Sequence, residues 1–289
     1  MERRYVLADV FTDVAFGGNP LAVFLDGHGL ETRQMQAIAR EMNLSETTFV
    51  TRGSGPGAFR VRIFTPANEL PFAGHPTIGT AVVLAENGAA EGRTEIMLEE
   101  GVGPVRVTLG EGRATLHREG APERLDCDIT GEQAADALGI SAAALTGAPW
   151  CAGYGLPYVF VCLRDVSSVS ACALRADRWL ALGRPLRDPY VFAFTSVVAG
   201  AASLRARMFS PANGIAEDAA TGSAAAALAG SITGMIAGET LRLTIAQGIE
   251  MGRPSRIETE TQYRDGRVAG VSVGGGAVIV GEGRLLRMP

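Results

Sequence analysis

The sequence predicts an α+β fold of two pseudo-symmetric domains, each a curved, mainly antiparallel and barrel-like sheet wrapped around one buried helix. First, the phrase RIFTPAN at 62–68 recurs as RMFSPAN at 207–213, an offset of 145 residues (207 − 62 = 145). Second, each phrase precedes an apolar segment without a polar face, at 76–87 and 221–237. Third, Gly-rich turns among β-rich runs follow both segments. Self-similarity at a fixed offset signals repeated architecture, and a helix without a polar face is a buried one.

The elements of the first half support this prediction in order. Met35, Ile38, Ala39 and Met42 have helical spacing and predict an amphipathic helix. SETTFV at 45–50 then predicts a strand. The apolar helix begins with Pro76 in its first turn and has Gly88 beyond its end, as helix termini favour. A hairpin is expected at the turn Gly110-Glu111-Gly112.

The second half follows the same plan. LPYVFV at 156–161 is interpreted as the counterpart of SETTFV, and Gly238 closes the second helix. Asp265-Gly266 predicts a further hairpin. The expected domains are 1–121 and 122–280, with the strand at 281–289 returning to the first, because chain ends often lie close together. The active site is expected in the cleft between the domains.

Composition and charge exclude several classes of protein. The 289 residues, 47% of them apolar, suffice for a large core. A net charge of −5 argues against nucleic-acid binding. The N-terminus lacks the apolar core of a signal peptide, and the run at 223–238 is too short and too rich in Ala, Gly, Ser and Thr for a membrane span. A cytoplasmic protein is therefore expected.

Neither a metal nor a nucleotide is expected as cofactor. The three histidines, His28, His75 and His117, occur in separate contexts without ligand spacing. No phosphate-binding glycine motif occurs in a strand-to-helix setting. The cysteines show no CxxC spacing, which favours reduced structural thiols; they are Cys127, Cys151, Cys162 and Cys172.

The two buried helices mark the candidate site. Unpaired N–H groups and the positive end of the dipole make a helix N-terminus an anion site. His75 directly precedes Pro76 and is interpreted as functional, although a structural histidine is the alternative. Asp218 lies in the corresponding turn, where a functional carboxylate and a simple helix cap remain equally open. Glu46 is, from the residues alone, a solvated loop acid.

Several separated motifs, in order along nearly the whole chain, resemble the PhzF family of phenazine-biosynthesis isomerase-like proteins, which share the diaminopimelate epimerase-like fold. They are DVFTDVAFGGNPLAVF (9–24), NLSETTFV (43–50), RIFTPANELPFAGHPTIG (62–79), EDAATGSA (217–224) and QGIEMGRPS (247–255). One departure is Ala219, where the family usually has proline.

The resemblance implies an isomerase without metal or organic cofactor, similar to trans-2,3-dihydro-3-hydroxyanthranilate isomerase. It places the acid/base on Glu46, against the loop-acid interpretation, and implies a small carboxylate substrate and a homodimer. A single carboxyl in a water-poor site can take a proton from one carbon and return it to another. The remaining implied site residues are His75 and Asp218 as polar active-site groups, and Asn19, Ser45, Gly74, Gly222 and Ser223 as substrate-binding groups.

Two alternatives remain open. One is an epimerase or racemase with opposed bases that are not thiols; the other is a non-catalytic protein that binds a small ligand. Related epimerases place a cysteine before each buried helix. Here those turns carry Gly74-His75 and Glu217-Asp218. A two-thiol epimerase is therefore excluded.

Overall fold

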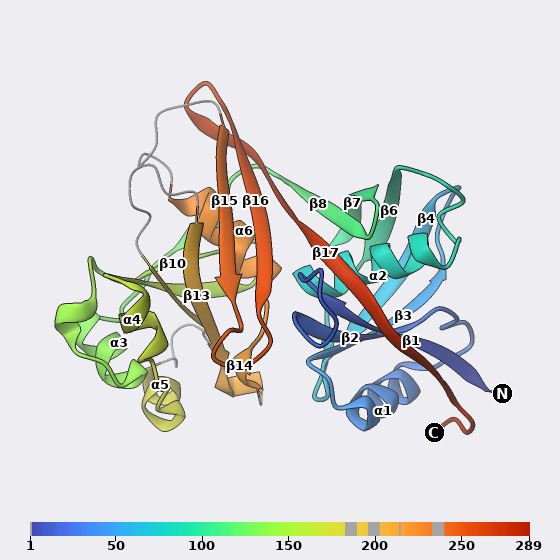
Figure 1. Cartoon of the computed structure of the whole chain (residues 1–289), viewed down its shortest axis with the longest axis horizontal. Coiled ribbons are helices and arrows are strands. Elements are labelled where there is room, and N and C mark those ends of the chain that lie inside the picture. Colours follow the sequence, from blue (N-terminus) through green and yellow to red (C-terminus); the bar gives the residue numbers. More distant parts are fainter. Residues whose placement is uncertain (1, 183–189, 196–202, 214, 233–239) are drawn as a thin grey trace. The chain divides into compact units, whose positions relative to one another are not determined.

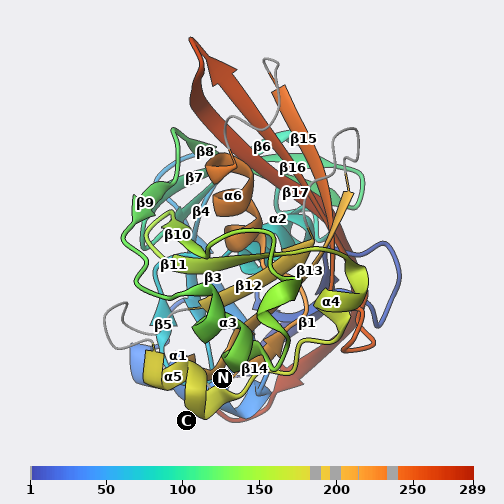
Figure 2. The same ribbon diagram turned by 90° about the vertical axis from the view of Figure 1, so that its left-hand side faces the viewer.

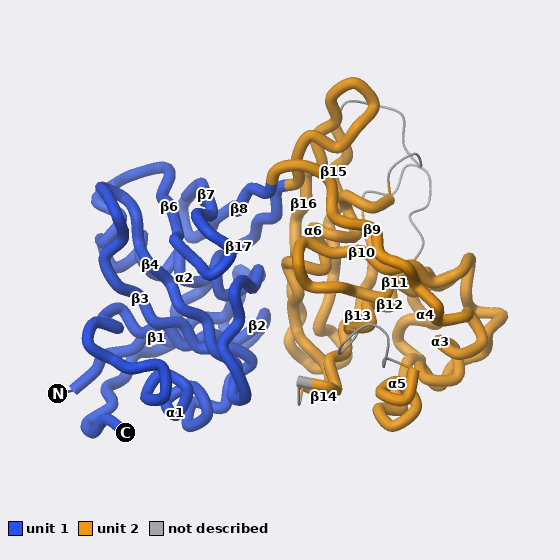
Figure 3. The backbone as a smooth tube through the Cα atoms, turned by 180° about the vertical axis from the view of Figure 1, so that it is seen from behind, with its two compact units in different colours: residues 1–118, 272–289 blue, residues 119–271 orange. Residues whose placement is uncertain are grey.

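The computed structural model describes residues 2–182, 190–195, 203–213, 215–232 and 240–289. They form two compact units, residues 1–118 with 272–289 and residues 119–271, coloured separately in Figure 3. The sequence places the division at 121/122 and starts the returning segment at 281. In the structure the chain divides at 118/119 and returns at Ser272, because one long strand supplies residues to both units.

Unit 1 is a closed sheet around one helix (Figure 1). Its elements are β1 Arg3–Val10, β2 Asn19–Phe24, α1 Thr32–Met42, β3 Glu46–Arg52, β4 Ala58–Phe64, β5 Glu69–Leu70, α2 Gly74–Glu86, β6 Glu95–Glu100, β7 Gly103–Gly110, β8 Arg113–Glu119 and the later part of β17 Arg267–Leu285. Strand β17 pairs with β8 and with β1, which closes the sheet.

Helix α2 fills the interior of unit 1, as its composition predicts. Its residues from Gly74 to Leu84 are all buried. Gly79 allows the close approach, since a Cβ there would lie 2.5 Å from Val10 Cγ2 and 2.6 Å from Leu21 Cδ2. Helix α1 instead packs one apolar stripe, Met35, Ile38 and Ala39, against the outside of the sheet.

Unit 2 repeats the plan with additional helices. Its elements are β9 Glu123–Leu125, α3 Gly131–Leu138, a 3₁₀ turn Ala142–Ala144, β10 Trp150–Gly153, β11 Pro157–Leu163, α4 Val166–Ser170, α5 Ala176–Leu182, β12 Tyr190–Thr195, β13 Ser203–Ser210, a 3₁₀ turn Pro211–Asn213, β14 Ile215–Asp218, α6 Gly222–Ser231, β15 Thr240–Gln247, β16 Ser255–Arg264 and the start of β17. Helix α6 lies among these strands (Figure 2).

The repeat is visible in the strand pairings. β2 pairs parallel with β3, and β3 antiparallel with β4; β11 pairs parallel with β12, and β12 antiparallel with β13. Strand β4 then pairs parallel with β6 across α2, as β13 does with β15 across α6. The counterpart of SETTFV at 45–50 is therefore β12, and its assignment to 156–161 is wrong: that segment is β11 and corresponds to β2. Moved by the offset of 145, residues 45–50 fall on 190–195, the span of β12, so the offset of the two phrases also holds for this strand.

The sequence predicts several turns and helix ends correctly. Asp265 and Gly266 both have positive φ (53° and 72°), the type I′ geometry of a tight hairpin. Gly88, after α2, has φ 74°. Helix α6, however, ends at Ser231 with Ile232 as its C-cap; the rest of the predicted helix and Gly238 lie outside the described residues. No helix within the described ranges is long and apolar enough to cross a membrane.

Candidate active site

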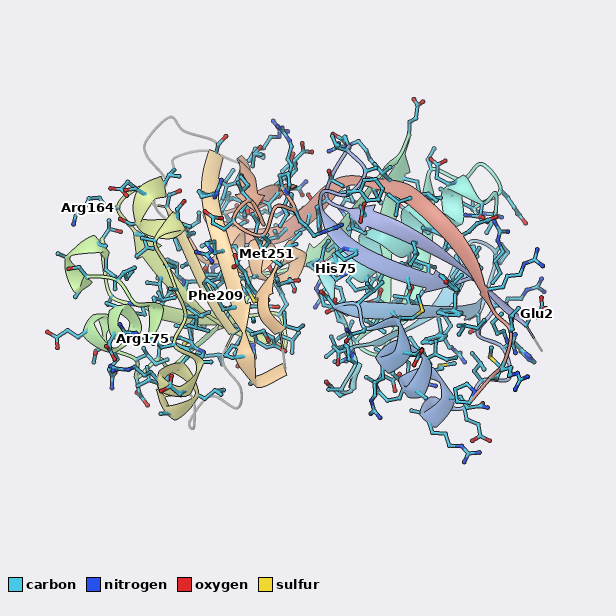
Figure 4. All side chains as sticks on the ribbon, turned by 60° about the horizontal axis from the view of Figure 1, so that its bottom comes forward. Glu2, His75, Arg164, Arg175, Phe209 and Met251 are labelled. Atoms are coloured by element: carbon cyan, nitrogen blue, oxygen red, sulfur yellow. The ribbon has the colours of Figure 1, made fainter. Side chains whose placement is uncertain are left out.

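Three of the expected residues meet inside unit 1. Asn19 begins β2, Glu46 begins β3 and His75 lies in the first turn of α2, where Figure 4 labels it. His75 Nε2 lies 3.3 Å from Glu46 Oε2, and His75 Nδ1 lies 3.2 Å from Asn19 Nδ2. The parallel pairing of β2 with β3, which sets Leu21 opposite Glu46, brings these strand ends together below the helix.

Burial decides how Glu46 is interpreted. Asn43 ends α1 in the left-handed conformation (φ 51°), and the chain turns at once into β3. Glu46 is 9% exposed. The solvated loop acid suggested by the residues alone is therefore wrong: this carboxyl is a buried group beside a buried imidazole.

His75 is a neutral imidazole in this setting. It is 3% exposed, and burial lowers its pKa from 6.5 to about 3. With Asn19 Nδ2 donating to Nδ1, the single ring proton of a neutral histidine resides on Nε2, the atom that faces Glu46. The ring therefore presents an uncharged N–H to the carboxylate, and the asparagine sets its tautomer.

Gly18 explains why Asn19 can reach the histidine. Its φ is +60°, and a Cβ would lie 2.3 Å from the carbonyl oxygen of Val10. Only glycine fits so close to the neighbouring backbone. The Gly-Asn-Pro sequence thus brings the fully buried Asn19 under the N-terminus of α2.

A second buried carboxyl, missed in the sequence, lies at the same helix turn. Glu100, the last residue of β6, is 7% exposed, and its Oε1 lies 2.7 Å from Thr77 Oγ1. Burial raises the pKa of Glu100 to about 8, opposed by the bond to Thr77 and by the charge of Arg118. A signal was present, because Glu100 is in phase with the inward-facing Ile96 and Leu98.

Unit 2 gathers another group around the N-terminus of α6. Asp218 ends β14, is 7% exposed and accepts a 2.6 Å hydrogen bond from Thr221 Oγ1. Gln247 Nε2 donates to the Asp218 carbonyl (2.8 Å) and to Thr221 Oγ1 (2.9 Å), while Thr221 N–H donates to Gln247 Oε1 (3.2 Å). The N-cap of α6 is Thr221, so Asp218 does not occupy the capping position.

Gly222 and Ser223 form the first turn of α6. Ser223 Oγ lies 2.7 Å from Tyr158 Oη, and Tyr158 is 2% exposed. The sequence did not single out Tyr158, Thr221 or Gln247. Gln247 carries the same signal as Glu100: it ends the strand after the helix, in phase with the buried Leu243 and Ile245.

Each unit therefore carries its own group of polar residues at a helix N-terminus. Unit 1 holds Asn19, Glu46 and His75; next to them in the chain are Ser45, which is half-buried, and Gly74, which is buried. The N-cap residues of α2 and α6 make no side-chain hydrogen bond to the first turn, and N–H groups at such a helix terminus can bind an anion. Among the described residues, no three His, Cys, Asp or Glu side chains are grouped to hold a metal ion.

Comparison with known proteins identifies the family of the chain. The chain matches the family described as phenazine biosynthesis-like protein over residues 8–283. It is 41% identical to an uncharacterized isomerase of Mesorhizobium japonicum, over 98% of each chain. It is 39% identical to trans-2,3-dihydro-3-hydroxyanthranilate isomerase of Pseudomonas aeruginosa, covering 97% of this chain and 98% of the relative.

The fold has close neighbours among solved structures. A crystal structure of a phenazine biosynthesis protein of the PhzF family from Bacillus anthracis superposes with a TM-score of 0.89 at 23% identity, covering 99% of this chain and all of that one. A hydroxyproline epimerase from Agrobacterium vitis shares the fold with a TM-score of 0.67 at 15% identity, covering 98% and 92%. The expected epimerase-like α+β fold is confirmed. The chain belongs to the phenazine biosynthesis-like, or PhzF, family and is an enzyme of the isomerase class.

Proposed function

We propose that this enzyme moves a proton between two carbons of a small cyclic amino or hydroxy acid, with Glu46 as the general acid/base. The observation that carries the proposal is the buried carboxyl of Glu46, 3.3 Å from the neutral His75 ring that Asn19 orients. A relative 39% identical over nearly the whole chain is named trans-2,3-dihydro-3-hydroxyanthranilate isomerase. That compound is accordingly the first substrate to test.

The reaction requires one carboxyl group that transfers the proton and polar groups that hold the substrate. The Glu46 carboxylate removes a proton from one ring carbon, and the electron pair of that C–H bond shifts the double bond. The resulting carboxylic acid exchanges its proton with solvent and delivers a proton to a second carbon, so the enzyme ends as it began. One well-placed acid–base group contributes on the order of 10²- to 10⁴-fold to such a rate.

His75 lies beside the carboxyl, with Nε2 3.3 Å from Glu46 Oε2, and adds no charge of its own. An uncharged donor leaves Glu46 free to exchange its proton, whereas an imidazolium would hold it ionised. The uncapped N-terminus of α2 begins at Gly74, next to the ring, and would stabilise negative charge that develops on the substrate.

We further propose that unit 2 supplies the groups that bind the substrate's polar substituents. Asp218 would accept hydrogen bonds from an amino or hydroxyl group, and the N–H groups and hydroxyl of Gly222 and Ser223 would bind a carboxylate. The duplicated architecture and the uncapped first turn of α6 support this role. The enzyme is proposed to need no metal or organic cofactor, and to act as a cytoplasmic homodimer.

The test begins with a thermal-shift screen of dihydro-hydroxyanthranilate and other cyclic amino acids, followed by proton NMR of any stabilising compound in heavy water. A migrated double bond with deuterium at one new carbon supports the proposal. Exchange at a stereocentre without migration would favour an epimerase instead. Activity retained after dialysis against EDTA supports a metal-free reaction, and light scattering of the purified protein tests the homodimer.

A further inference from the structure

Both copies of the Arg-x-Phe phrase form the same three-residue contact. In unit 1 the Arg62 guanidinium lies over the Phe64 ring, 5.1 Å from its centre, and donates two bonds to the carboxylate of Glu69, at 2.7 and 2.6 Å. In unit 2 Arg207 lies 4.9 Å from the centre of Phe209 and donates two bonds to Glu217, at 2.8 and 2.7 Å.

In each copy the glutamate lies on the strand that returns from the turn. Glu69 begins β5, which pairs with β4 through two residue pairs. Glu217 lies in β14, which pairs with β13 through Met208–Asp218 and Ser210–Ile215, with a register shift between them. So few pairs specify the register of a strand weakly. A bidentate arginine–carboxylate pair supplies the missing constraint because its geometry is fixed.

The constraint matters most in unit 2. Glu217 and Asp218 are consecutive strand residues, so their side chains point to opposite faces of β14. Glu217 faces Arg207, and Asp218 faces Thr221. A slip of one residue would put one of the two carboxylates in the place of the other and would leave an alanine in the vacated position.

Arg207 is itself held firmly. Its Nη1 donates to the carbonyl oxygens of Cys172 and Ser170, at 2.5 and 3.2 Å, at the end of α4. The side chains of the pair are 10% and 14% exposed, and the hydrogen bonds to Glu217 raise the pKa of Arg207 above its ordinary value against the effect of burial. Figure 4 labels Phe209 on β13, from which this contact starts.

We propose that Arg207 and Glu217 are positioning residues, whose bidentate pair fixes the register of β14 and thereby holds Asp218 at the N-terminus of α6. The inference rests on the proposed function only in that Asp218 acts on the substrate. The pair in unit 1 is the matched comparison. Arg62 and Glu69 are 29% and 37% exposed, and Glu69 is followed by Leu70, so the register of β5 sets no site carboxylate.

The test uses Glu217→Gln and Arg207→Lys, with Glu69→Gln and Arg62→Lys as controls. Glutamine keeps the shape of the glutamate side chain. Lysine keeps the positive charge of arginine but lacks the two parallel N–H groups that bind both carboxylate oxygens. Two readouts are taken on the full-length protein: amide hydrogen exchange over 215–221, and kcat and KM with dihydro-hydroxyanthranilate. Because a misplacement of about 1 Å can cost roughly 10²-fold, we expect kcat to fall about 10- to 100-fold in both unit 2 variants. Exchange at Asp218 and Thr221 should speed about tenfold, while both control variants keep the wild-type values.

The two proposals fail in different ways. A wild-type enzyme that does not turn over the compound contradicts the proposed function, while exchange at 215–221 still decides the register. If Glu217→Gln exchanges like the wild type over 215–221 and keeps its kcat, the positioning role is overturned. If Arg207→Lys keeps wild-type exchange and kcat while Glu217→Gln does not, a positive charge at residue 207 is sufficient, and the requirement for bidentate geometry is overturned.

Discussion

Glu100 gives a prediction whose magnitude follows from the structure. Thr77 Oγ1 lies 2.7 Å from both the Ala73 carbonyl oxygen and Glu100 Oε1. A hydroxyl group has one proton to donate. An ionised Glu100 accepts from Thr77 and so competes with the Ala73 carbonyl for that proton, and both contacts are hydrogen bonds at once only when Glu100 is protonated and donates to Thr77. This agrees with the burial that raises the Glu100 pKa from 4.5 to about 8.

The sign of the pH dependence follows from proton binding. Between pH 4.5 and about 8 the folded protein keeps the Glu100 proton, whereas the unfolded chain has lost it. The folded state binds more protons, so the free energy of unfolding falls as the pH rises through this window. The stability contributed by the protonated form is complete below 4.5 and is lost towards 8. Each pH unit inside the window costs about 1.4 kcal/mol, which gives roughly 3 kcal/mol between about pH 5 and about pH 7.

Glu100→Gln removes this dependence, since glutamine stays neutral and can donate to Thr77. Urea unfolding of the wild type and the variant at the two pH values measures the effect. The variant should gain roughly 3 kcal/mol relative to the wild type between about pH 5 and about pH 7. Glu95→Gln, an exposed position on the same strand, is the control and should show no such gain. An equal difference between Glu100→Gln and wild type at both pH values would refute the reasoning.

Three further predictions concern the site and its frame. The His75 ring, with its pKa near 3, should not titrate in nitrogen-15 NMR spectra between about pH 8 and about pH 5; a midpoint near 6.5 would contradict its burial as a neutral group. Gly248 has φ 73°, and a Cβ would lie 2.4 Å from the Arg253 carbonyl oxygen, so Gly248→Ala should lower the free energy of unfolding by more than about 2 kcal/mol. Gly252 has φ 70° but no atom within 4 Å of an added Cβ, so Gly252→Ala should lower the free energy of unfolding by only about 1 kcal/mol in the same assay. An equal loss of stability in the two variants would contradict the steric explanation. Alkylation of the half-buried Cys127 and Cys162, followed by mass spectrometry, should leave turnover unchanged; proportional loss of activity would restore a role for thiols.

Much of the fold could be predicted because the two halves share a recognisable sequence phrase. A shared phrase followed by a helix without a polar face locates α2 and α6 without any knowledge of distant contacts. The pairing of 45–50 with 156–161 failed because it departs from the offset of 145, which carries 45–50 onto 190–195, the span of β12. The offset no longer carries β2 onto β11, because the connection from β11 to β12, with α4 and α5, is longer than that from β2 to β3. Offsets locate equivalent elements only as far as no insertion intervenes.

The site shows a similar division between local and distant causes. His75 and Asp218 could be singled out because each precedes a buried helix. Glu46 could not, since its burial depends on the parallel pairing of β2 with β3, and only the family resemblance identified it. Glu100 and Gln247 were missed although both interrupt an inward-facing apolar alternation, at the end of the strand that follows the helix. A polar residue in phase with buried neighbours would have been the better sign.

The central claim, that Glu46 moves the proton, is tested most directly by following the reaction of dihydro-hydroxyanthranilate in heavy water by proton NMR, with wild type and Glu46→Gln side by side. Glutamine keeps the size of the side chain and cannot accept and return a proton. The account predicts double-bond migration with deuterium at one carbon in the wild type, and a rate lower by about 10²- to 10⁴-fold in a folded Glu46→Gln variant. A variant rate within about tenfold of the wild type, with the same deuterium pattern, would contradict it.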